Sequence, residues 1–306
     1  MAKVYNVDSS FDFGLFDGSS CAFGVFDGVH KGHRFLLACA RETARENNGA
    51  SIALTFDIDP DEVFRPSHLK KLMTNEDRIA ALAASGVDYV VVLPFTRRFA
   101  SQGPEDFLAA TFGGYAPYAL HVGADFHFGK CASGDVSDLM SWAQSRLARI
   151  YAHDLESMEG AAITATRIRG LLSDGHCAEA NDLLGHPYTF AGVVQPGRGQ
   201  GSDMGFSTAN LCIPPMLRAL GDGVYAAWVT IGDSRWKAAI SVGVSRVFDD
   251  AVATCEVHIL DFSDDIYGET ITVEPVCFLR PMIKFDSVDE LIATVKGNIE
   301  WVREHL

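Results

Sequence analysis

The sequence predicts an α/β protein of two domains: a first domain built on a mostly parallel sheet, and a small antiparallel β-barrel followed by a C-terminal helix. Strand and helix patterns alternate up to about residue 186, and short β-like runs with glycine-rich turns follow from Tyr188 to about Phe278. The 306 residues are enough for two domains that each bury a core. We therefore expect one domain at 1–186 and a second at 187–306.

In the first domain, apolar runs typical of buried strands alternate with stretches typical of helices. The expected strands are Cys21–Phe26, Ser51–Phe56, Tyr89–Leu93 and Ala119–Val122, and the expected helices are Arg34–Asn47, Asn75–Ala84, Pro104–Phe112 and Ser137–Arg149. Asn75 is a candidate N-cap, and Gly86 a candidate C-terminal stop. This alternation favours a parallel sheet with its ligand site beyond the carboxyl ends of the strands.

The second domain shows closely spaced strand patterns, which favour a small antiparallel barrel. The expected strands include Tyr188–Val194, Gly223–Ile231, Lys237–Val242, Thr254–Leu260 and Thr270–Val276. Residues 287–306 have the apolar spacing of a helix. Ser287 is expected to cap this helix, with Glu290 completing a capping box.

Composition excludes several classes of protein. Apolar residues make up 48% and charged residues 21%, as in a soluble globular protein, and we found no membrane-length apolar run and no basic leader. A cytoplasmic protein without a membrane partner is expected. The 7 cysteines are scattered, which argues against a disulfide framework or a zinc site.

A net charge of −15 disfavours a nucleic-acid partner. A small polyanion needs only a local cationic cluster, however. Candidates for such a cluster are Lys31, Arg34, Lys130, Arg167 and Arg169. A phosphate-bearing small molecule is therefore compatible with the overall acidity.

The run His30-Lys31-Gly32-His33 is the first candidate site. It follows an expected strand and an Asp27-Gly28 turn, and it precedes an expected helix. Backbone N–H groups at a helix start are unpaired and bind anions. Two imidazoles there predict a site where a phosphate chain reacts. A metal site would need a third ligand that is not nearby, and a structural role for the histidines is the alternative.

A second segment, Ile163–Arg169, combines hydroxyls and arginines at an expected helix start. Thr164 or Thr166 can cap that helix while the arginines face phosphates. A capped surface helix is the alternative interpretation.

These motifs make the first half resemble the adenylyltransferase module of bacterial bifunctional riboflavin kinase/FAD synthetases, within a wider nucleotidyltransferase superfamily with a Rossmann-like fold. The matching segments are Phe23–His33, Thr55–Asp57, Val122–Gly129 and Thr164–Arg169. The resemblance implies attack of the FMN phosphate on the α-phosphorus of ATP, with release of pyrophosphate.

The resemblance also implies roles for single residues. His30 and His33 would donate to the reacting phosphoryl oxygens, and Asp125 would position Mg²⁺ or the flavin phosphate. Contacts to ATP or its phosphates are implied for Gly24, Phe26, Asp27, Gly28, Thr164, Thr166 and Arg169, and contacts to the flavin for Asp125, Phe126 and Phe128. Core packing is the alternative for one of the two phenylalanines. Ala165 stands where the family usually has a serine, which removes one phosphate contact.

The glycine-rich stretch Gly197–Asn210 is the second candidate site, although it fails the dinucleotide and Walker A patterns. With Asp222–Tyr225, Glu256–Phe262, Tyr267-Gly268 and Lys284–Ser287, it resembles the riboflavin kinase module of the same enzymes. The resemblance implies that Gly199, Gly201 and Gly205 bind ATP, that Thr208 and Asn210 hold Mg²⁺·ATP, and that Glu256 is the base for the riboflavin hydroxyl, with ADP as product. A solvent-facing strand residue is the alternative for Glu256.

The second half also departs from the family. Ser207 replaces a proline, Ser245-Arg246-Val247 replaces an Asn-Pro-Thr stretch, and Met282 stands in place of a glutamate. The leading hypothesis is a bifunctional enzyme that converts riboflavin to FMN and FMN to FAD, each step using ATP and Mg²⁺. One alternative is an FMN adenylyltransferase with a degenerate flavin-binding barrel, and another is a non-catalytic flavin-binding regulator. The sequence does not predict the oligomeric state.

Overall fold

The computed structural model describes residues 1–65, 70–196, 206–217, 219–244 and 253–306. Its contacts divide the chain into two compact units. The first unit is Met1–Leu69 with Met73–Ala165, and the second is Lys70–Leu72 with Thr166–Leu306. The domain boundary after residue 186 stays a prediction, since this division groups the chain from Thr166 onward with the second unit.

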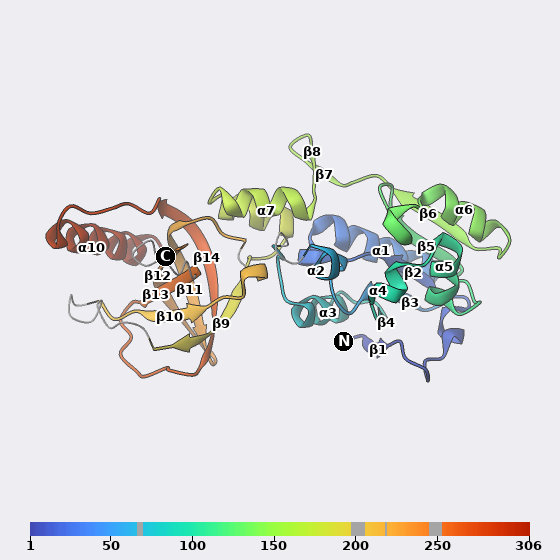
Figure 1. The fold of residues 1–306 in the computed structure, drawn as a ribbon, viewed down its shortest axis with the longest axis horizontal. Coiled ribbons are helices and arrows are strands. Elements are labelled where there is room, and N and C mark those ends of the chain that lie inside the picture. The colour runs from blue at the N-terminus through green and yellow to red at the C-terminus, as the bar shows by residue number, and fades with distance from the viewer. Residues whose placement is uncertain (66–69, 197–205, 218, 245–252) are drawn as a thin grey trace. The chain divides into compact units, whose positions relative to one another are not determined.

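The first unit is built on a parallel sheet of six strands, as the sequence predicts (Figure 1). The order is β1-β4-β3-β2-β5-β6, and every neighbouring pair is parallel. The strands are β1 (Lys3–Asn6), β2 (Ser20–Phe23), β3 (Ser51–Phe56), β4 (Tyr89–Leu93), β5 (Ala119–Gly123) and β6 (Arg149–His153). The chain runs outward from β2 through β3 to β4 and then returns to β5 on the other side of β2. This reversal creates a switch point between β2 and β5, where ligands bind in open α/β sheets.

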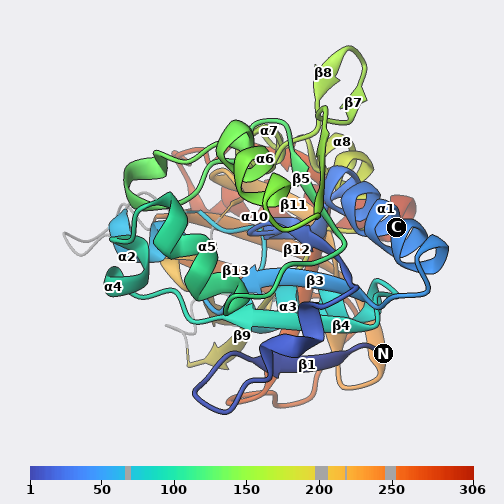
Figure 2. The same ribbon diagram turned by 90° about the vertical axis from the view of Figure 1, so that its right-hand side faces the viewer.

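Helices cover both faces of this sheet. The helices of this unit are α1 (Lys31–Glu46), α2 (Pro60–Phe64), α3 (Asn75–Ala84), α4 (Arg97–Ala100), α5 (Pro104–Phe112) and α6 (Val136–Gln144). One buried cluster joins Leu37 of α1 and Leu82 of α3 to Val90 of β4. The cluster on the other face joins Phe107 of α5 and Leu139 of α6 to the sheet. In Figure 2, α3 and the strands β3 and β4 can be followed within this unit.

The helix boundaries correct some expectations. Thr74, not Asn75, caps α3, because its Oγ1 accepts from the Asp77 backbone N–H at 2.9 Å. Gly86 follows the end of α3 with φ of +88°, which confirms it as a stop. The helix expected over Ser137–Arg149 ends at Gln144, and Arg149 is the first residue of β6 instead.

The second unit contains a closed antiparallel barrel, which confirms the predicted architecture. The order is β10-β13-β12-β11-β14-β9. The elements are α7 (Ala165–Ser173), α8 (Cys177–Leu184), β9 (Phe190–Gln195), β10 (Ala209–Cys212), β11 (Gly223–Ile231), β12 (Ser234–Val244), β13 (Ala253–Ile259), β14 (Thr270–Arg280) and α10 (Val288–His305). Closure pairs the edge strands, so their backbone groups are satisfied within the barrel.

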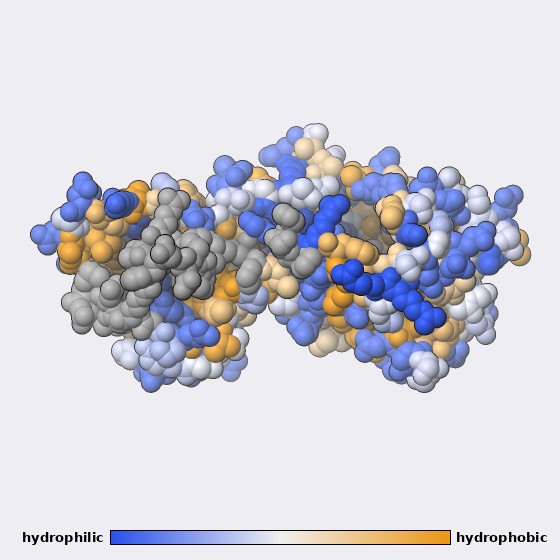
Figure 3. Space-filling model, viewed as in Figure 1, coloured by the Kyte–Doolittle hydropathy of each residue, from blue (hydrophilic) through white to orange (hydrophobic). Residues whose placement is uncertain are grey.

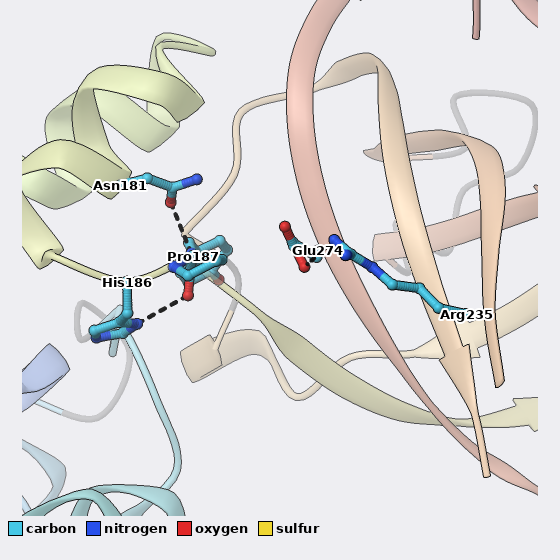
Figure 4. Close-up of polar contacts among 6 residues, drawn as sticks. Asn181, His186, Pro187, Arg235 and Glu274 are labelled. Atoms are coloured by element: carbon cyan, nitrogen blue, oxygen red, sulfur yellow. Dashed lines mark hydrogen bonds and ion pairs between the residues drawn. The ribbon is translucent and has the colours of Figure 1, made fainter. Parts of the chain in front are cut away.

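Local contacts fix how the chain enters and crosses the barrel (Figure 4). The Asn181 side chain of α8 accepts from the Tyr188 backbone N–H at 2.7 Å, just before β9. Across β11, Nη2 of Arg235 in β12 lies 2.8 Å from Oε2 of Glu274 in β14. Ser287 caps α10 by accepting from the Glu290 N–H at 3.2 Å, as predicted. The capping box is not formed as expected, because the Glu290 carboxylate accepts from the Asp286 N–H.

On the face seen in Figure 3, hydrophilic residues are interspersed with smaller apolar areas. Among the helices that the structure describes, no one combines the length and the apolar character needed to cross a bilayer.

Candidate active sites

The connection from β2 to α1 places both histidines of the first motif at the start of a helix, as predicted. His30 is the N-cap of α1, and its Nδ1 accepts from the His33 backbone N–H at 3.3 Å. The two imidazole rings stack with centroids 3.6 Å apart. The loop before them is tightly turned, since Phe26, Gly28 and Val29 all have positive φ. The turns of this loop therefore bring the two imidazole rings together at the start of α1.

Both rings line a cavity of about 240 Å³. Its walls come from the ends of β2, β5 and β6, from the start of α1, and from the segment before α7. Seven of the predicted site residues line it: Gly24, Phe26, His30, His33, Asp125, Phe126 and Thr164. The cavity thus lies at the switch point of the sheet, where sequence reasoning expects a ligand.

Other predicted residues of this site lie elsewhere. Asp27 and Gly28 are buried within the loop and do not line the cavity. Phe128 is 4% exposed and packs on Phe107 in the core, with ring centroids 5.3 Å apart. Its contact with flavin stays a prediction.

His33 is held neutral by its surroundings. Burial lowers the pKa of His33 well below its ordinary value, and the nearby charges of His30 and Arg78 lower it further. Its Nδ1 is buried and has no hydrogen-bond partner within the described ranges. An arriving polyanion would favour the protonated form, so this ring can gain charge when phosphates bind.

Sequence reasoning missed a second histidine pair. His153, at the end of β6, lines the cavity, and its Nε2 lies 2.9 Å from Nδ1 of His121 in β5. His121 is 2% exposed, and burial together with His153 lowers its pKa to about 4. Both residues lie in neighbouring strands of the sheet, and β6 lacks the apolar run that would have revealed the pairing.

The barrel gathers polar residues along one row of its strands. Asn210 of β10 lies directly opposite Glu256 of β13, and Glu256 lies opposite Ser241 of β12. Directly opposed residues have Cβ atoms about 5 Å apart. Thr208, just before β10, lines a cavity of about 250 Å³ together with Ser207 and Tyr267. Ser241 is a candidate that the motifs did not reveal.

Comparisons with known proteins match both halves of the chain. The FAD synthetase family model matches residues 15–167, and the riboflavin kinase family model matches residues 184–306. The chain belongs to the bifunctional riboflavin kinase/FMN adenylyltransferase family.

Two curated members of this family illustrate the match. The protein of Listeria monocytogenes is 34% identical over 90% of this chain and 88% of its own length. The protein of Escherichia coli K12 is 33% identical over 94% of this chain and 93% of its own length. A crystal structure from Streptococcus pneumoniae, titled as a macrolide-efflux protein, is 32% identical with a TM-score of 0.85 and covers 98% of both chains. The shared fold therefore extends over both halves of the chain.

Some predicted ATP-binding residues of the barrel, and one of its departures from the family pattern, fall on residues that the structure does not describe. Gly199, Gly201 and Gly205, and the stretch Ser245-Arg246-Val247, lie outside the described residues. Met282 is 50% exposed, and its Sδ accepts from the Ser241 hydroxyl at 3.5 Å. The methionine thus lies beside the row that contains Glu256.

The turn that holds Thr208 is anchored by a side chain. The Ser207 carbonyl lies 2.8 Å from Nδ1 of His258, which donates to it. Proline is absent at position 207, so φ there is not fixed by a ring. The contact with His258 restrains the same turn by another route.

Proposed function

We propose that this chain makes FAD from riboflavin in two ATP-dependent steps, with riboflavin phosphorylated in the barrel and FMN adenylylated in the cavity of the first unit. We assign the adenylyltransferase to residues 1–186 and the kinase to 187–306, with a cytoplasmic location. The observation that carries the proposal is the pair of stacked imidazoles, one of them capping α1, in an open cavity at the sheet's switch point.

In the adenylyl transfer, an FMN phosphate oxygen attacks the α-phosphorus of ATP, and the bond to the pyrophosphate oxygen breaks. Such a transfer depends on alignment and on donors that face the developing charge. Because Nδ1 of His30 accepts from the His33 N–H, the neutral ring carries its proton on Nε2. We propose that this Nε2–H donates to a phosphoryl oxygen during the reaction, with His33 as the second imidazole.

The remaining residues of the first site would hold the nucleotide. Thr164 lines the cavity and is a candidate for the β- and γ-phosphates, while Thr166 and Arg169 of α7 do not line it and stay candidates from the sequence resemblance alone. Asp125 is an exposed carboxylate of the lining that fits Mg²⁺ arriving with ATP. When bound, Mg²⁺ neutralises charge on the phosphates.

In the kinase reaction, Glu256 would accept the proton of the riboflavin 5′-hydroxyl while that oxygen attacks the γ-phosphorus and ADP leaves. Asn210, opposite Glu256, and Thr208, at the neighbouring cavity, are the candidates for Mg²⁺·ATP. The neutral thioether of Met282 beside this row supports one alternative, a barrel that binds flavin and has lost turnover. A flavin-binding regulator without any turnover is the third hypothesis.

A product assay separates these hypotheses. The full chain is incubated with ATP and Mg²⁺ plus either riboflavin or FMN, and the flavins are resolved by chromatography. We expect FMN and FAD from riboflavin, and FAD from FMN. FAD from FMN with riboflavin untouched would support the adenylyltransferase alone, and no product from either flavin would leave the regulator.

A further inference from the structure

The loop from Gly24 to Val29 is held by a buried arginine that lies in none of the sequence motifs. Arg78 of α3 is 1% exposed. Its Nη1 donates to the Val25 carbonyl at 3.0 Å and to Thr55 Oγ1 at 2.6 Å, and its Nη2 donates to the Phe56 carbonyl at 2.8 Å. A single guanidinium therefore joins α3 to the loop after β2 and to the end of β3.

Of the groups that accept from Arg78, the Val25 carbonyl is the one that belongs to the loop before His30. Val25 lies between Gly24 and Phe26, which both line the cavity, and it precedes the positive-φ turns that lead to His30. Thr55 Oγ1, which accepts from Arg78, itself donates to the same carbonyl at 3.3 Å. Two side chains from outside the loop thus bind the peptide group between Val25 and Phe26.

Burial lowers the pKa of Arg78 from its ordinary value, and four nearby carboxylates oppose this effect. Asp57, Asp59 and Glu62, from the segment after β3, and Asp27, from the loop itself, are these carboxylates. Asp27 and Asp59 are 4% and 7% exposed. The planar fork of arginine suits several fixed acceptors at once, which a lysine ammonium cannot match.

We propose that Arg78 is a positioning residue for adenylyl transfer, which fixes the loop from Gly24 to Val29 so that His30 and His33 align with the reacting phosphates. This inference rests on the proposed function of the first unit. Arg78 lies outside the cavity lining, so it acts through the loop and does not touch the nucleotide.

The test is Arg78→Lys in the full chain, with kcat and KM of FAD formation measured from FMN and ATP. We expect kcat to fall about 100-fold, because small misplacements of reacting groups cost that much. KM values for FMN and ATP should stay within about threefold, since the loss falls on the transition state. Riboflavin phosphorylation by the same preparation should be unchanged.

Arg41→Lys is the matched control, since Arg41 of α1 donates to the Ser85 carbonyl at 3.3 Å, away from the loop. It should retain its kcat. A folded Arg78→Lys protein with normal kcat, a rise in KM alone, or an equal loss in Arg41→Lys would overturn the proposal. If Arg78→Lys does not fold, Thr55→Val decides, with a fall in kcat of about tenfold expected and no change overturning it. A wild-type chain that makes no FAD from FMN would instead contradict the proposed function.

Discussion

At the scale of single residues, the first site depends on His33, which is neutral when no ligand is bound. Burial and the nearby Arg78 guanidinium lower the pKa of His33, and the capping bond places the proton of a neutral His30 ring on Nε2. An imidazole in this state costs little to bury and can still donate to a phosphate. The uncharged imidazole is therefore compatible with burial in the unliganded protein, and it can still bind a phosphate chain.

His121 makes the stability of the first unit depend on pH. Its pKa is about 4 in the fold against 6.5 as the ordinary value, so the unfolded chain binds more protons between these pH values. Stability is therefore fully present above pH 6.5 and is lost as pH falls toward 4, by about 3 kcal/mol from this residue alone. Urea unfolding of the full chain over this pH range, with hydrogen exchange of β5 as the local readout, measures the loss.

The variant His121→Asn should remove this contribution and leave a shallower pH dependence, by about 1.4 kcal/mol for each pH unit in that window. Comparison at pH 7, where both proteins lack a charge at this position, separates titration from the loss of packing. An identical slope in both proteins would contradict this assignment.

At the scale of elements, helix starts decide the geometry of both halves. His30 caps α1 and Ser287 caps α10. We expect Ser287→Ala to destabilise the second unit by about 1 kcal/mol, because the Glu290 N–H loses its acceptor. The shift of the unfolding midpoint in urea measures this, with Ser234→Ala, an exposed serine at the start of β12, as control. Equal effects of the two changes would argue against a role for the cap.

Sequence patterns predicted the elements with strong periodicity and missed those that depend on neighbours. The parallel sheet, the barrel and the helix after Ser287 followed from apolar runs and a cap signal. Thr74 and Asn75 are adjacent cap-forming residues, so local preference could not choose between them. β6 went unnoticed because its residues are largely exposed and form no apolar run.

Site residues that lie in one sequence motif could be predicted. Residues that come together only through the fold could not. His30 and His33 are close in sequence and share a helix start, so their convergence could be predicted. The pairing of His121 with His153 requires that β5 and β6 be neighbours. A lone arginine on a helix normally predicts a solvent-exposed side chain, so the burial of Arg78 could not be expected. The roles assigned to the site residues stay predictions until variants are measured.

At the scale of the whole molecule, we propose one reaction for residues 1–186 and the other for residues 187–306, with FMN as the substrate of the first and the product of the second. His30 and His33 line a cavity whose walls all belong to the first unit. Asn210 and Glu256 lie on paired strands of the barrel. Each reaction should therefore be separable by a single substitution, although both use ATP.

The most direct measurement compares His33→Ala and Glu256→Ala in one assay that follows FMN formed from riboflavin and FAD formed from FMN. We expect His33→Ala to lower FAD formation about 100-fold or more and to retain FMN formation, because one donor to the reacting phosphate is lost. Glu256→Ala should do the reverse, because the proton acceptor for the riboflavin hydroxyl is lost. A folded variant of either kind that loses both reactions, or a His33→Ala protein that still forms FAD at the wild-type rate, would show that the two reactions do not have separate sites with these residues.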